Sequence, residues 1–353
     1  CGGKNIGRRY HLFREFAAAL GSGSFEYFGL NSSQVVNGRV KTFEGAARWR
    51  TMADLVRGLA ARDVIRFARL LLRVKRDAAS GYLGSAYSRA LGERFDDAPA
   101  STYFSAEFCR RILRPMSVRM NGAEPDEVFM GNLPSNVRMI LDTYEQLAHG
   151  LAPLLTACLG RYDVRLRTVT ESLIVENGRV IGVRIRRADG TGEELRGAGV
   201  ILATPASVAA ALTDAVVPAL AQRLRSIAYY PVSLVIAEYE KPVFARHARA
   251  FVFDGEEAVS NAGAYGVNDL HLVRYTFSGR TSRHFASDFT DPEALLRMGE
   301  APLARVVPFD GNRRRRFVAR RFTTGLCAYA PHHARIMDGI ERELRTLEGL
   351  HLT

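Results

Sequence analysis

Residues 162–215 decide the fold: YDVRLRTVTESLIVENGRVIGVRIRRADGTGEELRGAGVILATPASVAAALTDA. Within them, Asp163–Leu173 carries the apolar and β-branched residues of a strand. Asn177-Gly178 is a strong hairpin signal, and Val180–Ile185 then alternates into a second strand that ends at Asp189-Gly190. The stretch therefore predicts two antiparallel strands at the start of a sheet.

The same stretch closes with a third strand and a helix. Gly199–Thr204 is almost continuously apolar, which is typical of a strand buried on both faces. The strand stops at Pro205, and Ser207 can cap a helix that begins near Val208. The sequence thus predicts a tight turn at the carboxyl edge of a sheet, where α/β proteins bind ligands.

Length and composition describe a globular protein. The 353 residues are 47% hydrophobic, which is enough for a large core and for two or three domains. No apolar run is long enough for a transmembrane helix, and the four cysteines lack metal-ligand spacing. We therefore expect a cytoplasmic protein, although a chain that begins at Cys1 is also what a mature bacterial lipoprotein shows.

The formal net charge of +12 predicts attraction to anionic surfaces. In residues 55–76, arginines and apolar residues recur at helical spacing on opposite faces. Such a helix either lies on an anionic membrane or packs its apolar face on its own domain. We expect possible peripheral association with the inner membrane face through this segment.

Two other clusters do not indicate a binding function. Arg313–Arg316 follows a Gly-Asn turn without interleaved aromatic residues, so we expect a solvated turn that enters a strand, and no nucleic-acid partner. His332 and His333 are adjacent and would point apart on a regular element, so we expect no metal site.

The quoted stretch resembles the closing half of the FAD-binding domain in the superfamily of flavin amine oxidases, protoporphyrinogen oxidases and phytoene desaturases. The features that carry the resemblance are the hairpin "NGRVIGV", the "ATP" tripeptide that ends a strand, the opening "GGK" and the closing "FTTGLCAYAPHHARIMDGIERELRTLEGLHLT". The segment "AYYPVSLVIAEYEKPVF" resembles the strand that re-enters the substrate domain of protoporphyrinogen oxidases.

The resemblance implies a set of site residues. Those expected to contact the FAD cofactor are Gly2, Gly3, Lys4, Val169, Thr170, Ala203, Thr204 and Pro205. Tyr230, Phe322 and Tyr329 are candidates for an aromatic wall that faces the substrate. The resemblance assigns no catalytic side chain, because the cofactor carries the chemistry.

The resemblance also implies the domain plan. The expected fold is α/β, with a Rossmann-like FAD-binding domain and an inserted α+β substrate domain. The GxGxxG fingerprint is absent, so we interpret the chain as a family member trimmed at both ends, inactive as a fragment. The expected FAD-binding domain comprises residues 1–30, 150–215 and 318–353, and the expected substrate domain comprises residues 31–149 and 216–317.

Other segments extend this plan. Residues 231–240 and 269–279 are expected to form strands of the substrate domain, and residues 105–120 and 135–159 to form helices above its cavity.

The implied function is an FAD-dependent oxidoreductase that takes a hydride from a hydrophobic substrate, a porphyrinogen or a polyene. The alternative is a non-catalytic carrier of the same fold that resembles the GDP-dissociation inhibitors.

Overall fold

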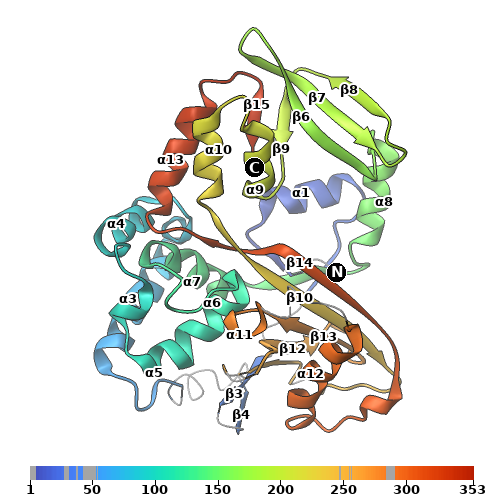
Figure 1. Cartoon of the computed structure of the whole chain (residues 1–353). Coiled ribbons are helices and arrows are strands. Elements are labelled where there is room, and N and C mark those ends of the chain that lie inside the picture. Colours follow the sequence, from blue (N-terminus) through green and yellow to red (C-terminus); the bar gives the residue numbers. More distant parts are fainter. Residues whose placement is uncertain are drawn as a thin grey trace.

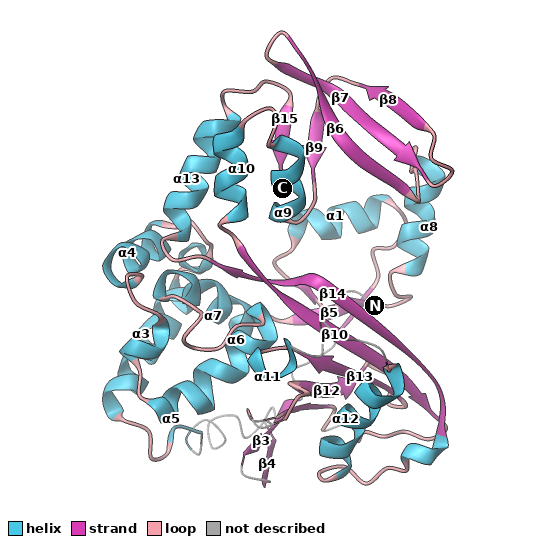
Figure 2. Cartoon of the chain, viewed as in Figure 1, coloured by secondary structure: helices cyan, strands magenta, loops and turns pink. Residues whose placement is uncertain are grey.

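The computed structural model describes residues 5–27, 32–36, 39–42, 53, 55–245, 248–253, 255, 257–283 and 291–353. Helices and strands group into three lobes around a central pair of long strands, β10 (Ala228–Tyr239) and β14 (Arg314–Tyr329) (Figures 1 and 2). We call them the sheet lobe (the seven-stranded sheet with α11, Arg280–Arg283, and α12, Pro292–Ala304), the helical lobe (residues 61–141) and the meander lobe (residues 168–225 and 333–352). The mixture of helices and strands confirms the expected α/β class.

The sheet lobe is built on seven strands. In spatial order they are β14 (Arg314–Tyr329), β10 (Ala228–Tyr239), β13 (Leu272–Phe277), β12 (Asn261–Ala264), β11 (Ala250–Val252), β3 (Ser32–Val36) and β4 (Arg39–Thr42). The predicted strands at 231–240 and 269–279 are confirmed as β10 and β13. The basic run at 313–316 also enters a strand as expected, because β14 begins at Arg314.

Alternation along these strands separates two faces of the sheet. Val235, Ala237, Val273 and Tyr275 point to one face and pack with α12 (Pro292–Ala304) in a buried core. The intervening residues of β10, β13 and β14 therefore point to the opposite face. That second face is only partly covered by described residues, which matters for the site below.

The helical lobe lies beside the sheet lobe and has its own core. Its helices are α3 (Ala61–Arg76), α4 (Ala86–Phe95), α5 (Ala106–Phe108), a π-helical turn (Cys109–Leu113), α6 (Arg114–Asn121) and α7 (Leu133–Leu141). Three short 3₁₀ segments connect them: Ala78–Gly81, Ala100–Tyr103 and Met130–Asn132. The helix expected in residues 105–120 is confirmed by α5, the π-helical turn and α6.

The amphipathic helix α3 packs its apolar side on its own lobe. Leu70 and Val74 are buried in the helical core, and Phe67 and Leu71 pack against that core. This is the second of the two arrangements expected from the sequence. The exposed arginine side of α3 stays available to an anionic membrane, and peripheral association remains a prediction. No helix within the described ranges is both long and apolar enough to cross a bilayer.

The meander lobe contains the stretch that decides the fold. Its strands are β6 (Thr168–Glu176), β7 (Arg179–Arg187), β8 (Gly192–Arg196), β9 (Val200–Leu202) and β15 (Leu350–Leu352). Its helices are α9 (Ala206–Thr213), α10 (Pro218–Arg225) and α13 (His333–Leu344). The predicted hairpin is confirmed, because Asn177 and Gly178 have φ of 50° and 76° and join β6 to β7.

Three details of this lobe differ from the sequence-based expectation. The first strand begins at Thr168 and not at Asp163, and Ile201 of β9 is 65% exposed, since no described residue covers that face. Helix α9 begins at Ala206, earlier than Val208. Ser207 is therefore inside the helix and cannot cap it. The hydroxyl of Tyr229 accepts a hydrogen bond from the Ala206 amide instead, at 3.2 Å.

The expectation of continuous helix over residues 135–159 is wrong. Helix α7 ends at Leu141, strand β5 (Tyr144–Leu147) follows, and α8 (Ala152–Arg161) starts afterwards. β5 pairs with β1 (Ile6–Gly7) and with β2 (Phe25–Tyr27), and α1 (His11–Ala19) packs beside this small sheet. Pairing with strands distant in sequence therefore overrides the local helical spacing.

Candidate active site

Two neighbouring parallel strands of the meander lobe end at the edge where the sequence predicts cofactor contacts. β9 ends at Leu202, opposite Leu352 of β15. Ala203 and Thr204 follow β9 directly and are exposed, and Pro205 immediately precedes α9. Ligands of α/β proteins bind outside the carboxyl ends of parallel strands. The Ala-Thr-Pro turn therefore lies at an edge that is open to a ligand.

The other predicted cofactor contacts divide into two groups. Val169 and Thr170 lie on β6 with exposed side chains, and Thr170 pairs with Ile185 just before an irregularity of the ladder. Gly2, Gly3 and Lys4 lie outside the described residues.

The residues at this edge fit the dinucleotide that the resemblance implies. Ala203 and Thr204 have small side chains, which leave the backbone at the end of β9 open to close approach. Ile201 of β9, two residues before Ala203, is an apolar side chain that is 65% exposed. Nucleotide sites combine apolar walls for the rings with polar backbone groups. Of the described residues that the resemblance assigns to the cofactor, Ala203 and Thr204 lie at this edge, and Val169 and Thr170 lie on β6 of another sheet.

The three predicted aromatic residues all lie on the β10–β14 pair. Tyr230 of β10 pairs with Leu326, and Phe322 of β14 pairs with Val232. Tyr329 is the last residue of β14 and pairs with Ala228. Phe322 is 40% exposed, whereas Tyr230 packs against the core of the helical lobe.

Phe322 belongs to an apolar surface on the second face of the sheet. Its neighbours there are Leu234, Ile236 and Val318, which are half-buried and belong to none of the described core clusters. Phe317 and Ala319, which alternate with them along β14, pack instead on the α12 side. The second face therefore carries apolar side chains that belong to no described core cluster, together with the exposed Arg320, which pairs with Leu234.

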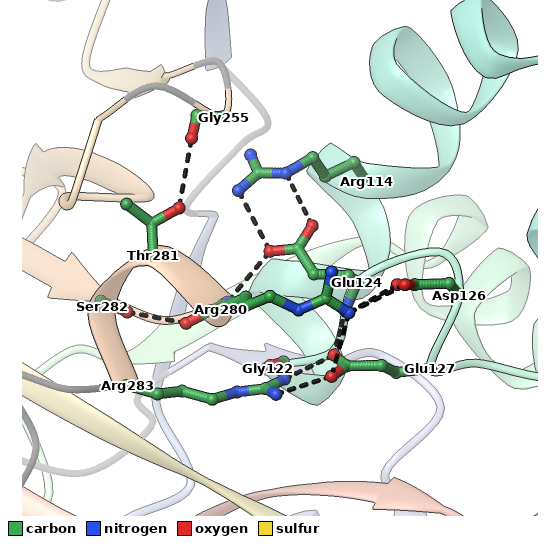
Figure 3. Close-up of polar contacts among 11 residues, drawn as sticks. Arg114, Gly122, Glu124, Asp126, Glu127, Gly255, Arg280, Thr281, Ser282 and Arg283 are labelled. Atoms are coloured by element: carbon green, nitrogen blue, oxygen red, sulfur yellow. Dashed lines mark hydrogen bonds and ion pairs between the residues drawn. The ribbon is translucent and has the colours of Figure 1, made fainter.

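Tyr230 is held by an arginine above its ring. The guanidinium carbon of Arg283 lies 3.5 Å from the ring centroid, a cation–π contact. Arg283 belongs to α11 (Arg280–Arg283), and it also donates to both carboxylate oxygens of Glu127, at 2.7 and 2.6 Å, and to the Gly122 carbonyl (Figure 3). The ring of Tyr230 is thus fixed by an ion pair between the sheet lobe and the helical lobe.

The same network continues on both sides of Glu127. Arg114 pairs with Glu124 at 2.7 Å, and Glu124 also accepts a hydrogen bond from the Arg280 amide (Figure 3). The Arg280 side chain donates to both oxygens of Asp126, each at 2.9 Å. Alternating charges therefore join the loop after α6 to α11.

Electrostatics keep Glu127 ionised. Burial alone would raise the pKa of Glu127, but hydrogen bonds from Arg283 and from the Glu124 amide, together with the charge of Arg283, lower that pKa to about 2. The pKa of Tyr230 is raised, first by burial and then by the nearby Glu127 carboxylate. Tyr230 is therefore a neutral phenol at physiological pH.

The segment after Tyr329 is constrained by buried polar side chains. Tyr329 and His332 both have positive φ, 65° and 50°, which L-residues rarely adopt. Asn132 donates to the Ala330 carbonyl, and the carboxylate of buried Asp96 accepts from the amides of His332 and Gly131. Groups from the helical lobe thus hold the end of β14 in place.

Each of the two histidines has a neighbour among the described residues. His332 contacts Asp97 at 2.9 Å, and His333 is buried beside the ring of Tyr329. In the part of the chain that the structure describes, no three His, Cys, Asp or Glu side chains are arranged to hold a metal ion.

Sequence reasoning missed Arg274 of β13, which pairs with Ile236 and therefore lies on the second face. The sequence held one signal for Arg274, which is the only charged residue in the apolar strand LVRYTF.

A family model described as flavin containing amine oxidoreductase matches residues 8–352. A search of curated proteins gives no match.

Several solved structures share the fold. Cyclohexylamine oxidase from Brevibacterium oxydans is 15% identical, with a TM-score of 0.72, and a putrescine oxidase solved with putrescine is 14% identical, with a TM-score of 0.72. A protein described as a protoporphyrinogen oxidase from an Exiguobacterium species is 16% identical, with a TM-score of 0.67. Each alignment covers 100% of this chain and 81% of the other. At these identities the likeness shows the fold alone.

Proposed function

The chain belongs to the flavin-containing amine oxidoreductase family, whose cofactor is FAD, and on that premise we propose that it oxidises a hydrophobic small molecule. The substrate classes that the sequence indicates are porphyrinogens and polyenes. The chemistry that bound FAD supplies is the removal of a hydride from the substrate.

The observation that carries this proposal is the row of apolar side chains on the second face of the sheet, which belong to none of the core clusters formed by the described residues. Phe322, Leu234, Ile236 and Val318 would bind an apolar substrate by burying its surface, at about 25 cal/mol per Å² of apolar area. Tyr230, which Arg283 fixes from above, adds an aromatic side chain on the neighbouring part of β10. These residues orient the substrate and exclude water, and no acid or base has to be assigned.

An absorbance spectrum of the intact protein tests the proposal. We expect flavin bands after purification or after reconstitution with FAD, and bleaching of these bands when a porphyrinogen or a polyene is added without oxygen. The matched ligand control is the corresponding porphyrin, which is already oxidised and should leave the bands unchanged.

Two outcomes would contradict the proposal. A colourless protein that cannot be reconstituted with FAD would favour the non-catalytic carrier. If the flavin bands bleach only with small hydrophilic amines, the result would agree with the chemistry of the family but would contradict the proposal of a hydrophobic substrate.

A further inference from the structure

The sequence contains three Asn-Gly pairs, and the structure describes two of them. The described pairs are Asn121-Gly122 and Asn177-Gly178, whereas Asn37-Gly38 lies outside the described residues. An asparagine side chain reacts most readily with the backbone of a following glycine, because glycine has no Cβ that hinders the approach. The surroundings of the two described pairs therefore decide whether either one is modified.

The reaction needs no reagent other than water. The glycine amide nitrogen bonds to Cγ of the asparagine, the Cγ–Nδ2 bond breaks, and Nδ2 leaves as ammonia with the proton of the glycine amide. Water then opens the cyclic imide at one of its two carbonyl groups. The product is aspartate, or isoaspartate, in which the main chain runs through the side chain. Both the asparagine side chain and the glycine amide therefore have to be free to move.

The contacts of Asn121-Gly122 prevent this movement. The Asn121 side chain donates to the Cys327 carbonyl at 3.0 Å and accepts from the Asn136 side chain at 2.7 Å. The Gly122 amide donates to the Val118 carbonyl at the end of α6. Asn121 is only 4% exposed, so water has little access to it.

Asn177-Gly178 has none of these restraints. It forms the tip of the hairpin between β6 and β7, and both residues are exposed. Among the residues that the structure describes, none forms a hydrogen bond with the Asn177 side chain or the Gly178 amide. Apart from the adjacent residues, no heavy atom lies within 4 Å of the place that a Cβ of Gly178 would take. The two reacting groups are therefore unhindered, and water reaches both.

The hairpin is connected to the strand beside the expected cofactor edge. Arg179, which follows the turn, forms an ion pair with Glu348, and the Val180 amide donates to the Glu348 carbonyl at 2.7 Å. Glu348 lies two residues before β15, the strand that pairs with β9. A change in the turn is therefore close to the contact that joins β7 to β15.

We propose that Asn177 is a site of spontaneous deamidation, and that its isoaspartyl form weakens the contact between the hairpin and β15. Isoaspartate lengthens the main chain of a two-residue turn, in which both residues have positive φ. The new carboxylate also lies next to Glu176 in the chain, which adds repulsion between like charges. Neither effect depends on the proposed function.

Mass spectrometry of the intact protein, incubated at mildly alkaline pH and then digested with trypsin, tests the site. Trypsin gives the peptide of residues 168–179, in which Asn177 is the only side-chain amide, and the peptide of residues 120–138, which contains Asn121. We expect the mass gain of deamidation to appear at Asn177 at least about tenfold faster than at Asn121, because the buried hydrogen bonds of Asn121 have to open first.

Two controls separate the effect of the fold from the chemistry of the dipeptide. In guanidinium chloride, where the contacts of Asn121 are lost, the two asparagines should react at similar rates. Asn177→Gly keeps a residue that suits positive φ and should abolish the mass gain in residues 168–179. Incubated unaltered protein should unfold at a lower urea concentration than fresh protein, and incubated Asn177→Gly should lose less.

Three results would overturn the proposal. They are the absence of a mass gain at Asn177 in the folded protein, equal rates at Asn177 and Asn121 in the folded protein, and an equal loss of stability in incubated Asn177→Gly and incubated unaltered protein. Either of the first two rejects the modification site that the structure assigns. The third rejects the effect of the modification on the hairpin.

Discussion

At the scale of single residues, the end of β14 has a backbone conformation that a sequence pattern cannot predict, because distant residues enforce it. Tyr329 and His332 adopt positive φ although neither is glycine, and Asn132 and Asp96 of the helical lobe bind the intervening backbone. Positive φ at such residues persists only where the surroundings enforce it. The sequence placed Tyr329 near the site, but these partners are about 200 residues away in the chain, at separations of 198 and 236 residues.

His333 should make stability depend on pH. Burial lowers its pKa to about 4, below the value of about 6.5 in an unfolded chain. Protons therefore bind the unfolded state more readily than the folded state. The stability that the folded protein has while His333 is neutral is complete above pH 6.5 and is lost as the pH falls towards 4. The free energy of unfolding should fall by about 3 kcal/mol across this window. Urea unfolding at a series of pH values measures the effect.

Two variants test whether His333 causes this dependence of the free energy of unfolding on pH. His333→Phe, which keeps an aromatic ring beside Tyr329, should flatten the dependence between pH 6.5 and 4. His149→Asn replaces an exposed histidine and should retain the full slope. An unchanged slope in His333→Phe would show that another group titrates there.

At the scale of elements, the sequence predicts those strands, turns and helices that are determined by residues adjacent in the chain. The Asn-Gly hairpin and the strand–turn–helix around Ala203 follow from φ preferences and from a proline, and the structure has both. Strand β8 was not predicted, because Gly192–Arg196 is polar and pairs only at the edge of the meander. Strand β5 was mistaken for helix, because pairing with β1 and β2 is invisible in local spacing.

The start of α9 gives an element-scale prediction. Pro205 and Ser207 do not cap the helix, and the Tyr229 hydroxyl accepts the hydrogen bond of the Ala206 amide. Tyr229→Phe removes this acceptor and should lower the free energy of unfolding by about 1 kcal/mol. Tyr162→Phe is the control, because Tyr162 is 50% exposed and keeps its ring contact with Arg161 as phenylalanine. Equal effects of the two variants would contradict a capping role.

At the scale of the whole molecule, the β10–β14 pair connects the three lobes (Figure 1). Tyr229 contacts the meander lobe, its neighbour Tyr230 contacts the helical lobe, and β13 continues the sheet. The sequence predicted these strands and their aromatic residues. It could not predict that Arg283 of α11 pairs with Glu127 of the helical lobe, because that contact depends on how segments distant in the chain pack together.

The ion pair between Glu127 and Arg283 gives the last prediction, because it joins the helical lobe to the sheet lobe. Its partners expose only 17% and 22% of their side chains. Glu127→Gln leaves Arg283 partly buried without a counter-charge, so the free energy of unfolding should fall by about 3 kcal/mol. Asp126→Asn is the control, since Asp126 exposes 50% of its side chain in its pair with Arg280, and it should cost less than about 1 kcal/mol.

The same pair predicts an acid limit distinct from that of His333. The pKa of Glu127 is about 2 in the folded protein and about 4.3 in an unfolded chain. The stabilisation that ionised Glu127 gives to the folded protein is therefore complete above pH 4.3. It is lost as the pH falls towards 2, which lowers the free energy of unfolding by about 3 kcal/mol. Urea unfolding of the unaltered protein should show this second loss below the histidine window, and Glu127→Gln should abolish it. Glu127 holds Arg283 over the ring of Tyr230. If Glu127→Gln kept the full loss of stability between pH 4.3 and 2, the ion pair would not be the cause of that loss, and it could not be said to fix the ring.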